Sequence, residues 1–485
     1  MSTSGTALTH QLFINGCSVP SSDLSSSPLI NPANGETIAT VSNGSAEDID
    51  SAVKAADAAY RGAWGAMKPG DRATALRNLA AKIRENVEEL ALLETKSVGK
   101  PLSSSRGEVG YAAKVYEYYA GLIPSVCGQT VPISANGTGL TFREPLGVCG
   151  LIVPWNFPIV ILAWKLAPAL AMGNTVVVKP AEWTPLTAIR LGELAIEAGI
   201  PAGVINIVPG LGPVAGAALS AHPQVRKISF TGSTATGSAI MKACADDIKR
   251  VSLELGGKSP SIVFADADLE KAAGSVMSIY DNTGQDCCGR SRYLVERSIY
   301  AEFVERFVAN SRAVKIGDPL DADTEIGPLA STIQWNRVDG YVKQGVAEGA
   351  QLCTGGGRPT AEQFAAGSYY EPTVFANVKP GMTIAQMEIF GPVVAIIPFD
   401  SETEAVEIAN GTPYGLAASI WTRDVARALR VVRAVEAGVI SVNSSSSVHL
   451  EMPFGGFKQS GIGRELSPAA MEQYSEVKSV FISAE

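Results

Sequence analysis

Residues 147–179 read GVCGLIVPWNFPIVILAWKLAPALAMGNTVVVK, and this stretch decides the fold class. The apolar, β-branched runs Val148–Val153 and Thr175–Val178 predict two buried strands. Between them lies the most apolar stretch of the chain, Pro158–Met172, with Lys165 in its middle. That stretch is about 15 residues long, whereas crossing a bilayer takes ~20 apolar residues. We therefore expect a buried helix in a strand–helix–strand unit and no membrane partner.

The alternation of strands and helices continues downstream. Further strands are predicted at Val204–Val208, Lys227–Thr231 and Val251–Leu255. Leu186–Ala198 carries leucine, alanine and isoleucine at helical spacing and is followed by Gly199-Ile-Pro201, a helix stop. This series predicts a parallel sheet with helices on both faces.

The flanking regions extend the α/β organisation in both directions. Residues 51–120 are rich in helix-forming residues and are broken at Lys68-Pro-Gly70 and Gly99-Lys-Pro101, so we expect helices that cover the sheet. After Gly257 a second α/β domain is predicted. Its expected helices are Leu269–Asn282 and Glu302–Val314, and its expected strands are Tyr293–Val295, Val393–Pro398 and Val439–Val442.

The composition of the chain indicates how many domains it has, which kind of partner it binds and in which cellular compartment it works. A chain of 485 residues exceeds what one hydrophobic core supports, so two or more domains are expected. The net charge of −9 gives no attraction for nucleic acid, which favours a small-molecule partner. Seven cysteines without paired spacing, and no Lys or Arg before Lys54, favour a cytoplasmic location. The histidines His10, His222 and His449 stand in no metal-ligand spacing, so no metal site is expected.

Three residues carry groups suited to nucleophilic chemistry on a carbonyl. Cys287, in the sequence GQDCC, is followed by Arg290 and Arg292, and nearby cations favour a thiolate. Glu254 ends an apolar strand, where burial raises the pKa of a carboxyl and makes it a better base at neutral pH. Asn156, at a strand-to-helix turn, offers an amide donor for an oxyanion. The ordinary alternatives are an inert buried thiol, a carboxylate that caps the following glycine turn, and a turn asparagine.

Three further segments are suited to a dinucleotide. Phe230–Gly237 (FTGSTATG) follows a strand and opens a helix, where free N–H groups attract a pyrophosphate or simply form a cap. Lys179 and Glu182 follow another strand, and they either hold ribose hydroxyls or lie in solvent. Glu388 and Phe390 precede a turn, where they either clamp a ring or pack at the end of a strand.

Seven motifs occur in order between Asn31 and Tyr474, namely PWNFP, KPAE, FTGS, LELGGK, GQDC, EIFGPV and PFGGFKQSGIGRE. Their order and spacing resemble those of the aldehyde dehydrogenase superfamily. The resemblance covers nearly the whole chain and is specific, because seven independent motifs agree. It implies an enzyme that oxidises an aldehyde to a carboxylic acid with NAD.

The resemblance also implies roles for the reactive residues. Cys287 matches the nucleophile that attacks the aldehyde carbon. The Asn156 side chain and the Cys287 backbone N–H match the donors that hold the oxyanion. Glu254 matches the base that activates water to cleave the thioester, which implies a free acid as product rather than transfer to coenzyme A.

NAD is the cofactor that the resemblance implies. Lys179 and Glu182 match positions at the adenosine ribose, and a glutamate there would repel the 2′-phosphate of NADP. Arg337 stands where many relatives carry lysine. The implied cofactor contacts are Trp155, Lys179, Glu182, Gly232, Ser233, Gln334, Glu388 and Phe390.

The family fold implies three units and a homodimer or homotetramer. These are a Rossmann-type NAD-binding domain, a catalytic α/β domain and a small β oligomerisation element. The short runs Thr130–Pro132 and Leu140–Arg143 are compatible with the third unit. The boundaries are 1–126 and 146–256 for the first, 257–456 for the second, and 127–145 and 457–485 for the third.

The positions that match the substrate tunnel of the family indicate the class of aldehyde. An aromatic tube suits an alkyl chain or a quaternary ammonium group, and Asp286 would attract a cationic tail. We hypothesise an ω-aminoaldehyde or a betaine-aldehyde-like substrate, with a broad range of aliphatic and aromatic aldehydes as the rival. The tunnel positions are Phe157, Trp164, Asp286, Cys288, Val448 and Phe454.

Two other classes of protein share some of these features. A non-catalytic relative would share the fold but would not need Cys287, Glu254 and Asn156 together. A cysteine hydrolase would need His449 beside Cys287 and would cleave esters without NAD.

Overall fold

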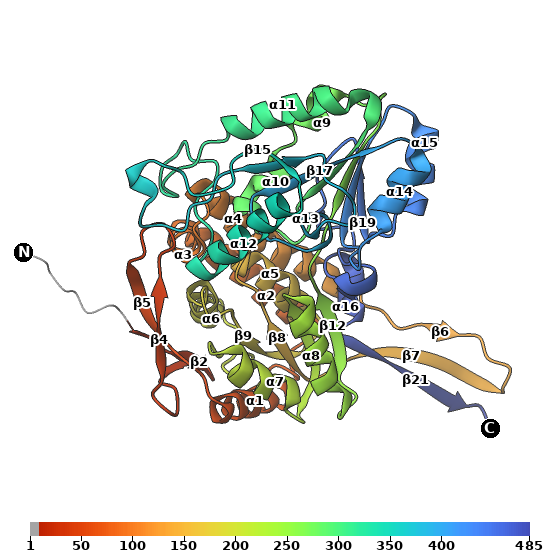
Figure 1. Ribbon diagram of the computed structural model, residues 1–485. Coiled ribbons are helices and arrows are strands. Elements are labelled where there is room, and N and C mark those ends of the chain that lie inside the picture. Colours follow the sequence, from red (N-terminus) through yellow and green to blue (C-terminus); the bar gives the residue numbers. More distant parts are fainter. Residues whose placement is uncertain (1–8) are drawn as a thin grey trace, which may run out of the picture.

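The computed structural model describes residues 9–485 and is organised around two sheets of mainly parallel strands, with a thin β arm extending from one side (Figure 1). This confirms the predicted α/β fold class. Residues 1–8 of the predicted NAD-binding range lie outside the described residues. None of the described helices has the length and apolar character needed to cross a bilayer.

The first sheet has eight strands in the order β20-β12-β11-β8-β9-β10-β2-β3. Its five central strands are parallel, and β20, β2 and β3 pair antiparallel at the edges. All five predicted strands of this region are confirmed, with ends shifted by one or two residues. The bounds are β20 (Gly461–Ile462), β12 (Arg250–Glu254), β11 (Val225–Thr231), β8 (Val148–Ile152), β9 (Thr175–Lys179), β10 (Ile205–Ile207), β2 (Leu12–Ile14) and β3 (Cys17–Val19).

The strand order makes this sheet doubly wound. From β8 the chain runs outward through β9 and β10, then returns to the other side of β8 through β11 and β12. The direction of winding reverses between β8 and β11, and in such sheets ligands bind outside the carboxyl ends of the strands at this reversal.

The predicted buried helix is confirmed as α5 (Pro158–Ala171), in which every residue is buried, Lys165 included. The predicted helical region before it forms four helices; both predicted breaks are confirmed, and a third break, at Asn86, was not predicted. Pro69 starts the second, Gly99 with φ of 92° ends the third, and Pro101 precedes the fourth. They are α1 (Ala46–Arg61), α2 (Pro69–Glu85), α3 (Val87–Val98) and α4 (Leu102–Leu122).

The second sheet has seven strands in the order β15-β16-β17-β14-β13-β18-β19, all parallel except β15. The sequence predicted only β14, β17 and β19. β13 was missed because it begins at a proline, and β18 because it reads AASIW, with little β propensity in its first half. The bounds are β15 (Gln351–Thr354), β16 (Thr373–Ala376), β17 (Val393–Phe399), β14 (Arg292–Glu296), β13 (Pro260–Val263), β18 (Ala417–Trp421) and β19 (Val439–Val442).

The predicted helix over Leu269–Asn282 is wrong in its extent. It is split into α9 (Leu269–Gly274) and α10 (Met277–Tyr280), and the chain then turns through Asn282 and Thr283 with φ of 48° and 57°. A left-handed backbone cannot continue a helix, so the segment before the predicted nucleophile is a strained loop.

The remaining helices surround the two sheets (Figure 1). The predicted helix over Glu302–Val314 is confirmed as α11 (Tyr300–Ala313), and that over Leu186–Ala198 as α6 (Leu186–Glu197). The others are α7 (Ala217–Ala221), α8 (Thr234–Ala245), α12 (Thr332–Ala347), α13 (Thr383–Gln386), α14 (Glu402–Asn410), α15 (Val425–Ala434) and α16 (Ser467–Glu472).

Two smaller sheets complete the molecule. One joins β1 (Thr9–His10), β5 (Thr37–Ser42) and β4 (Ser26–Ile30), and the other is the arm of β21 (Ser475–Ser483), β7 (Gly137–Pro145) and β6 (Thr130–Val131). Residues 457–474 lie against the first sheet instead of in the arm, because β20 pairs with β12 and α16 contacts α5. Within 457–485, only β21 pairs with the arm strand β7.

Candidate active site

The predicted site residues come from opposite ends of the strands in the two sheets. Asn156 follows β8 and Glu254 ends β12, at carboxyl ends in the first sheet. Cys287 and Glu388 lie in the loops that precede β14 and β17, at amino ends in the second sheet. The loops touch: Glu388 accepts a hydrogen bond from the Gly257 N–H at 3.1 Å, and Gly257 has no room for a side chain because the Cys287 carbonyl oxygen lies against it.

A cavity of about 450 Å³ opens beside Cys287. All six residues predicted to contact substrate line it, so sequence positions nearly 300 residues apart are brought together as expected. No lysine or arginine is among the described residues of its wall. The lining residues are Ser104, Gly107, Glu108, Tyr111, Phe157, Val160, Ile161, Trp164, Asp281, Asp286, Cys287, Cys288, Val448 and Phe454.

Asn156 is buried and joins the two sheets. Its side-chain Nδ2 donates to the main-chain carbonyl of Gln285 at 3.0 Å. The main-chain carbonyl of Asn156 accepts from Asn282 Nδ2 and Lys100 Nζ, both at 2.8 Å. One amide hydrogen is thus used to hold the loop of Cys287, and the other remains for a ligand. Asn156 does not itself line the cavity.

The thiol of Cys287 is held in its protonated form. A hydrogen bond with Cys288, then burial, raises its pKa well above the usual range, and the carboxylates of Asp286 and Glu388 add to this. The expectation that cations after the cysteine would favour a thiolate is therefore wrong for this structure.

The two arginines after the cysteine serve main-chain and serine groups instead. Arg290 donates to Ser419 Oγ and to the Cys288 carbonyl, and Arg292 donates to the carbonyls of Lys258, Ile408 and Ala409. Their hydrogen bonds organise the start of β14, which explains why their charge does not stabilise the thiolate.

Glu254 is 4% exposed, and neither of its carboxylate oxygens has a hydrogen-bond partner among the described residues. Burial raises its pKa well above the usual range, and the nearby Glu465 adds to the shift. Its Oε1 faces Gly455, where a Cβ would lie 2.7 Å away, and the preceding residue, Phe454, lines the cavity. Glu254 thus lies next to the cavity wall rather than in it.

At the carboxyl end of β9, Lys179 and Glu182 form a pair. Lys179 Nζ lies 3.2 Å from Glu182 Oε1, which also accepts from the Gly212 N–H at 2.7 Å. Burial lowers the pKa of Lys179. Glu182 is partly exposed and lies just after the end of β9.

Trp155 and the turn of Gly232 and Ser233 follow β8 and β11, the two strands between which the winding reverses. Trp155 packs edge-on against Phe390, with ring centroids 5.3 Å apart. Ser233 caps α8 by accepting from the Thr236 N–H at 3.3 Å, so the cap interpretation is confirmed. Beside it the buried Thr231 hydroxyl has no partner among the described residues. The unpaired hydroxyl, the helix start and the aromatic pair fit a dinucleotide.

Glu388 and Gln334 complete the predicted cofactor set on the second sheet. Burial raises the pKa of Glu388 to about 7. Gln334 Nε2 donates to the Phe390 carbonyl at 2.7 Å, and Arg337 donates to the Glu388 carbonyl at 3.1 Å. These contacts hold the loop before β17, in which Phe390 has φ of 62°.

Sequence reasoning missed three charged residues at the site. Glu108 and Asp281 line the cavity, and the buried Lys100 pairs with Glu108 at 2.6 Å while its Nζ lies 4.2 Å from the Phe157 ring centroid. From the sequence, Lys100 was interpreted only as part of the helix break Gly99-Lys-Pro101, and Glu108 only as one residue of the predicted helical region. Only the packing of α4 against α5 brings them to the cavity.

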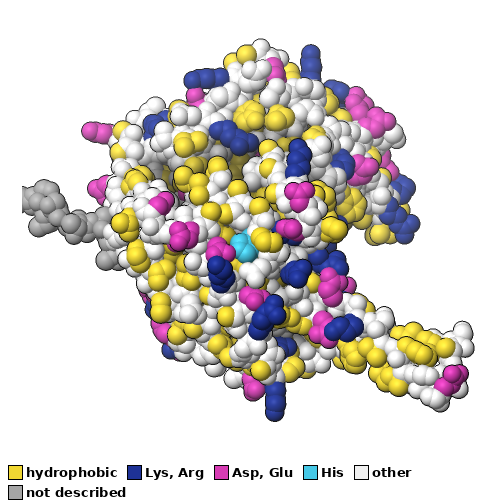
Figure 2. All heavy atoms as spheres, turned by 90° about the horizontal axis from the view of Figure 1, so that it is seen from below, with side chains coloured by type: hydrophobic (Ala, Val, Ile, Leu, Met, Phe, Trp, Pro, Cys, Tyr) yellow, Lys and Arg dark blue, Asp and Glu magenta, His cyan; other side chains and the backbone are white. Residues whose placement is uncertain are grey.

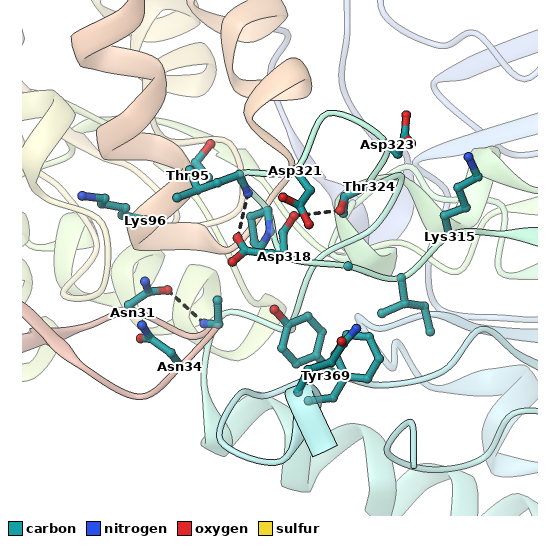
Figure 3. Close-up of a pocket in the computed structure, with 17 residues that line it drawn as sticks. Asn31, Asn34, Thr95, Lys96, Lys315, Asp318, Asp321, Asp323, Thr324 and Tyr369 are labelled. Carbon is teal, nitrogen blue, oxygen red and sulfur yellow. Dashed lines mark hydrogen bonds between the residues drawn. The ribbon is translucent and has the colours of Figure 1, made fainter. Parts of the chain in front are cut away.

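A second cavity, of about 710 Å³, lies away from these residues (Figure 3). It is lined by Asn31, Thr95, Lys315 and Asp318, among others, and by no cysteine. Its side chains bond mainly within their own loops, as Asp318 Oδ1 does with the Leu320 N–H at 2.9 Å. None of the predicted site residues lies there.

Comparisons with known proteins agree with the geometry. The sequence matches the aldehyde dehydrogenase family over residues 19–480. The mitochondrial aldehyde dehydrogenase of Mesocricetus auratus is 45% identical over 98% of this chain and 95% of its own length. The NAD⁺ complex of aldehyde dehydrogenase from Bacillus cereus superimposes with a TM-score of 0.96 at 44% identity, over 98% of this chain and 97% of that one.

A further solved structure is the NAD⁺ complex of a betaine aldehyde dehydrogenase from Staphylococcus aureus. Its TM-score is 0.96 at 39% identity, over 99% of this chain and 97% of that one. The family match, the sequence identities and the superposition over nearly the whole chain all agree. The chain therefore belongs to the aldehyde dehydrogenase family and is an NAD-dependent aldehyde oxidoreductase.

Proposed function

We propose that the enzyme oxidises a cationic aldehyde, an ω-aminoaldehyde or a betaine-aldehyde-like compound, to its carboxylic acid. The observation that carries this proposal is the cavity at Cys287. It combines aromatic walls with the carboxylates of Glu108, Asp281 and Asp286, and it has no cation in its described wall. The relative from Staphylococcus aureus that is named a betaine aldehyde dehydrogenase supports the same class.

Cys287 is the nucleophile in this proposal. Because burial and its neighbours raise the pKa of the Cys287 thiol, attack on the aldehyde carbon requires a base to take the proton, and we assign this role to Glu254, a buried carboxyl with no described partner next to the cavity wall. The oxyanion of the resulting thiohemiacetal accepts from the free amide hydrogen of Asn156. It also accepts from the Cys287 backbone N–H, which makes no bond among the described residues.

Once it has released the thiol proton to solvent, Glu254 acts a second time, when the thioester is cleaved. Taking a proton from water directs a hydroxide equivalent at the acyl carbon, and the acid leaves as Cys287 recovers its proton. When bound, NAD supplies the two-electron acceptor for the oxidation. The residues proposed to hold it are Trp155, Lys179, Glu182, Gly232, Ser233, Gln334, Glu388 and Phe390.

We further propose a preference for NAD over NADP. The Glu182 carboxylate lies at the end of β9 with one oxygen already bonded to Lys179 and Gly212. A 2′-phosphate beside it would meet negative charge, whereas ribose hydroxyls would donate to it.

The charged residues of the cavity do not contribute equally. Lys100 neutralises Glu108, whereas Asp286 bonds only to the Cys288 backbone N–H at 3.1 Å and the Cys288 thiol at 3.3 Å. Asp286 therefore has no described cationic partner beside the reacting carbon. A cationic tail gains both the Asp286 carboxylate and the faces of Phe157 and Trp164.

The test is a substrate panel measured by NADH formation with the wild type and the Asp286→Asn variant. We expect KM for aminoaldehydes and betaine aldehyde to rise by about 10-fold or more, while KM for hexanal and benzaldehyde changes little. Asp321→Asn, which removes a carboxylate from the second cavity in Figure 3, is the matched control. An equal rise for cationic and neutral aldehydes would favour the broad-specificity alternative.

The cysteine hydrolase alternative has no support in the geometry. His449 is not among the residues that line the cavity of Cys287. If the enzyme forms no NADH with any aldehyde of the panel, the result would favour the alternative of a non-catalytic relative.

The arm carries our proposal of a homo-oligomer. Its strands expose large apolar side chains, and they form a hydrophobic surface on the protruding arm (Figure 2). An isolated chain would leave this surface in water, and a second copy would cover it. Replacing Phe142 and Phe481 by serine should shift the mass measured by light scattering towards the monomer. The exposed residues are Val131, Ile133, Phe142, Val477, Phe481 and Ile482.

A further inference from the structure

Three adjacent side chains at the cavity have the geometry of a metal-binding group. The sulfur atoms of Cys287 and Cys288 and a carboxylate oxygen of Asp286 all lie within 4.8 Å of one another. Cys288 Sγ is 3.3 Å from both oxygens of Asp286. The expectation of no metal site rested on the spacing of the three histidines, and this group contains a carboxylate and two thiols but no histidine.

We propose that Asp286, Cys287 and Cys288 bind a thiophilic divalent cation of the Zn²⁺ class and that the bound cation reversibly blocks the enzyme. Two thiols lose their protons to the solvent as two metal–sulfur bonds form, and the carboxylate supplies the third ligand. The fourth tetrahedral position faces the cavity, where water completes the shell.

The separations suit such a cation. With Zn–S bonds of about 2.3 Å, two sulfur ligands of a tetrahedral site lie about 3.7 Å apart. The three ligand atoms already lie within 4.8 Å of one another, so side-chain rotations of modest size bring them to bonding distance.

The surroundings favour a divalent cation electrostatically. Asp281 lines the same cavity, in which Lys100 neutralises Glu108, and the Glu388 carboxylate contributes to the field at Cys287. The nearest buried cation, Arg290, turns its guanidinium to Ser419 and to the Cys288 carbonyl. A cation entering the cavity thus meets negative charge and no described competing lysine or arginine in its wall.

The consequence is competition between metal and aldehyde for one sulfur atom. While the cation holds Cys287, no thiohemiacetal can form, and the thiol is also shielded from oxidants. A chelator or a competing thiol removes the metal and restores the nucleophile.

The test is a titration of the chelator-treated enzyme with Cd²⁺, in the absence of NAD and aldehyde, followed by the ultraviolet charge-transfer band of cadmium thiolates. We expect one Cd²⁺ per chain and the release of protons. In Cys288→Ser and Cys287→Ser, affinity should fall by at least about 100-fold, since loss of even an outer partner of a metal ligand costs 10–100-fold. Asp286→Asn should show a smaller fall.

Cys353→Ser and Cys127→Ser are the matched controls, because both cysteines are free and lie outside the cavity. Circular dichroism checks that each variant is folded. A band that persists in both Cys287→Ser and Cys288→Ser, or that disappears in a control, overturns the proposal. Because the readout uses neither cofactor nor substrate, its failure leaves the proposed reaction untouched, and failure of the reaction leaves the metal site untouched.

Discussion

The two parallel sheets supply the site in opposite ways. The eight-stranded sheet offers the carboxyl ends of its strands, where the loops leave in a regular direction and side chains such as Asn156 follow directly from the strand. The seven-stranded sheet offers amino ends, and its residues come from irregular loops that include Asn282, Thr283 and Phe390 in left-handed conformations. The comparison teaches that the first half of the site follows from fold geometry, whereas the second half depends on local strain and on contacts between loops.

The largest expected effect falls on the second sheet. Cys287→Ser should lower kcat/KM for any aldehyde by at least about 10⁴-fold, because the nucleophile is lost. If NAD binds mainly to residues of the first sheet, the NAD affinity of the Cys287→Ser variant, measured by calorimetry, should stay within about threefold of the wild-type value. A large loss of NAD affinity would show that the two halves are not separable in this way.

The next largest effect is expected for Glu254, on the first sheet, and it includes a pH dependence of the hydrolysis rate. Glu254→Gln should slow thioester hydrolysis by about 10²–10⁴-fold, and it should also slow the first burst of NADH, because the same carboxylate takes the proton of Cys287. Since the pKa of Glu254 is raised by burial and its active form is the carboxylate, the wild-type hydrolysis rate should rise with pH through that raised pKa. Rapid-quench kinetics over a pH series checks both points, and an unchanged pH profile in the variant would remove Glu254 as the base.

A glycine pair tests the loop strain directly. Gly284 has φ of 74° and packs against the Gly391 carbonyl, so Gly284→Ala should shift the loop of Cys287 and lower kcat by about 10²-fold. Gly199 has φ of 88° with nothing within 4 Å of an added Cβ. Gly199→Ala should therefore cost about 1 kcal/mol of stability by urea unfolding and leave kcat unchanged. Equal kcat in the two variants would contradict the role given to loop contacts.

The smallest effect concerns cofactor choice at the first sheet. Glu182→Gln removes the negative charge beside the end of β9, so the ratio of kcat/KM for NADP to that for NAD should rise by about 10-fold, or about 1.4 kcal/mol. Steady-state kinetics with both cofactors measures the ratio. The neighbouring surface variant Glu193→Gln serves as the control, and an equal change there would point to general charge instead of a local contact.

The sequence was most informative where periodicity and motif coincide. Strands β8 to β12 and the buried helix α5 were predicted because β-branched runs and a long apolar segment leave little choice. The six cavity residues followed from the family resemblance and not from pattern.

The remaining features depend on tertiary contacts that no local pattern carries. β13 begins at a proline and β18 has weak β propensity in its first half, and both are completed as strands by pairing with their neighbours. The pKa of Cys287 was misjudged because proximity of Arg290 in the sequence says nothing about where its guanidinium points. Lys100 and Glu108 could be found only once α4 was packed on α5. The division into three units and the roles of the site residues stay predictions.

Helix α5 has a consequence for biosynthesis. It is apolar on all sides and contacts α2, α4 and α6 from its own neighbourhood, but also α16, which is encoded about 300 residues later. While the ribosome is still translating the second sheet, the side of α5 that later contacts α16 is exposed. Nascent or prematurely terminated chains therefore expose an apolar surface that chaperones and proteases can recognise. This surface is covered once α16 has been synthesised and packs on α5.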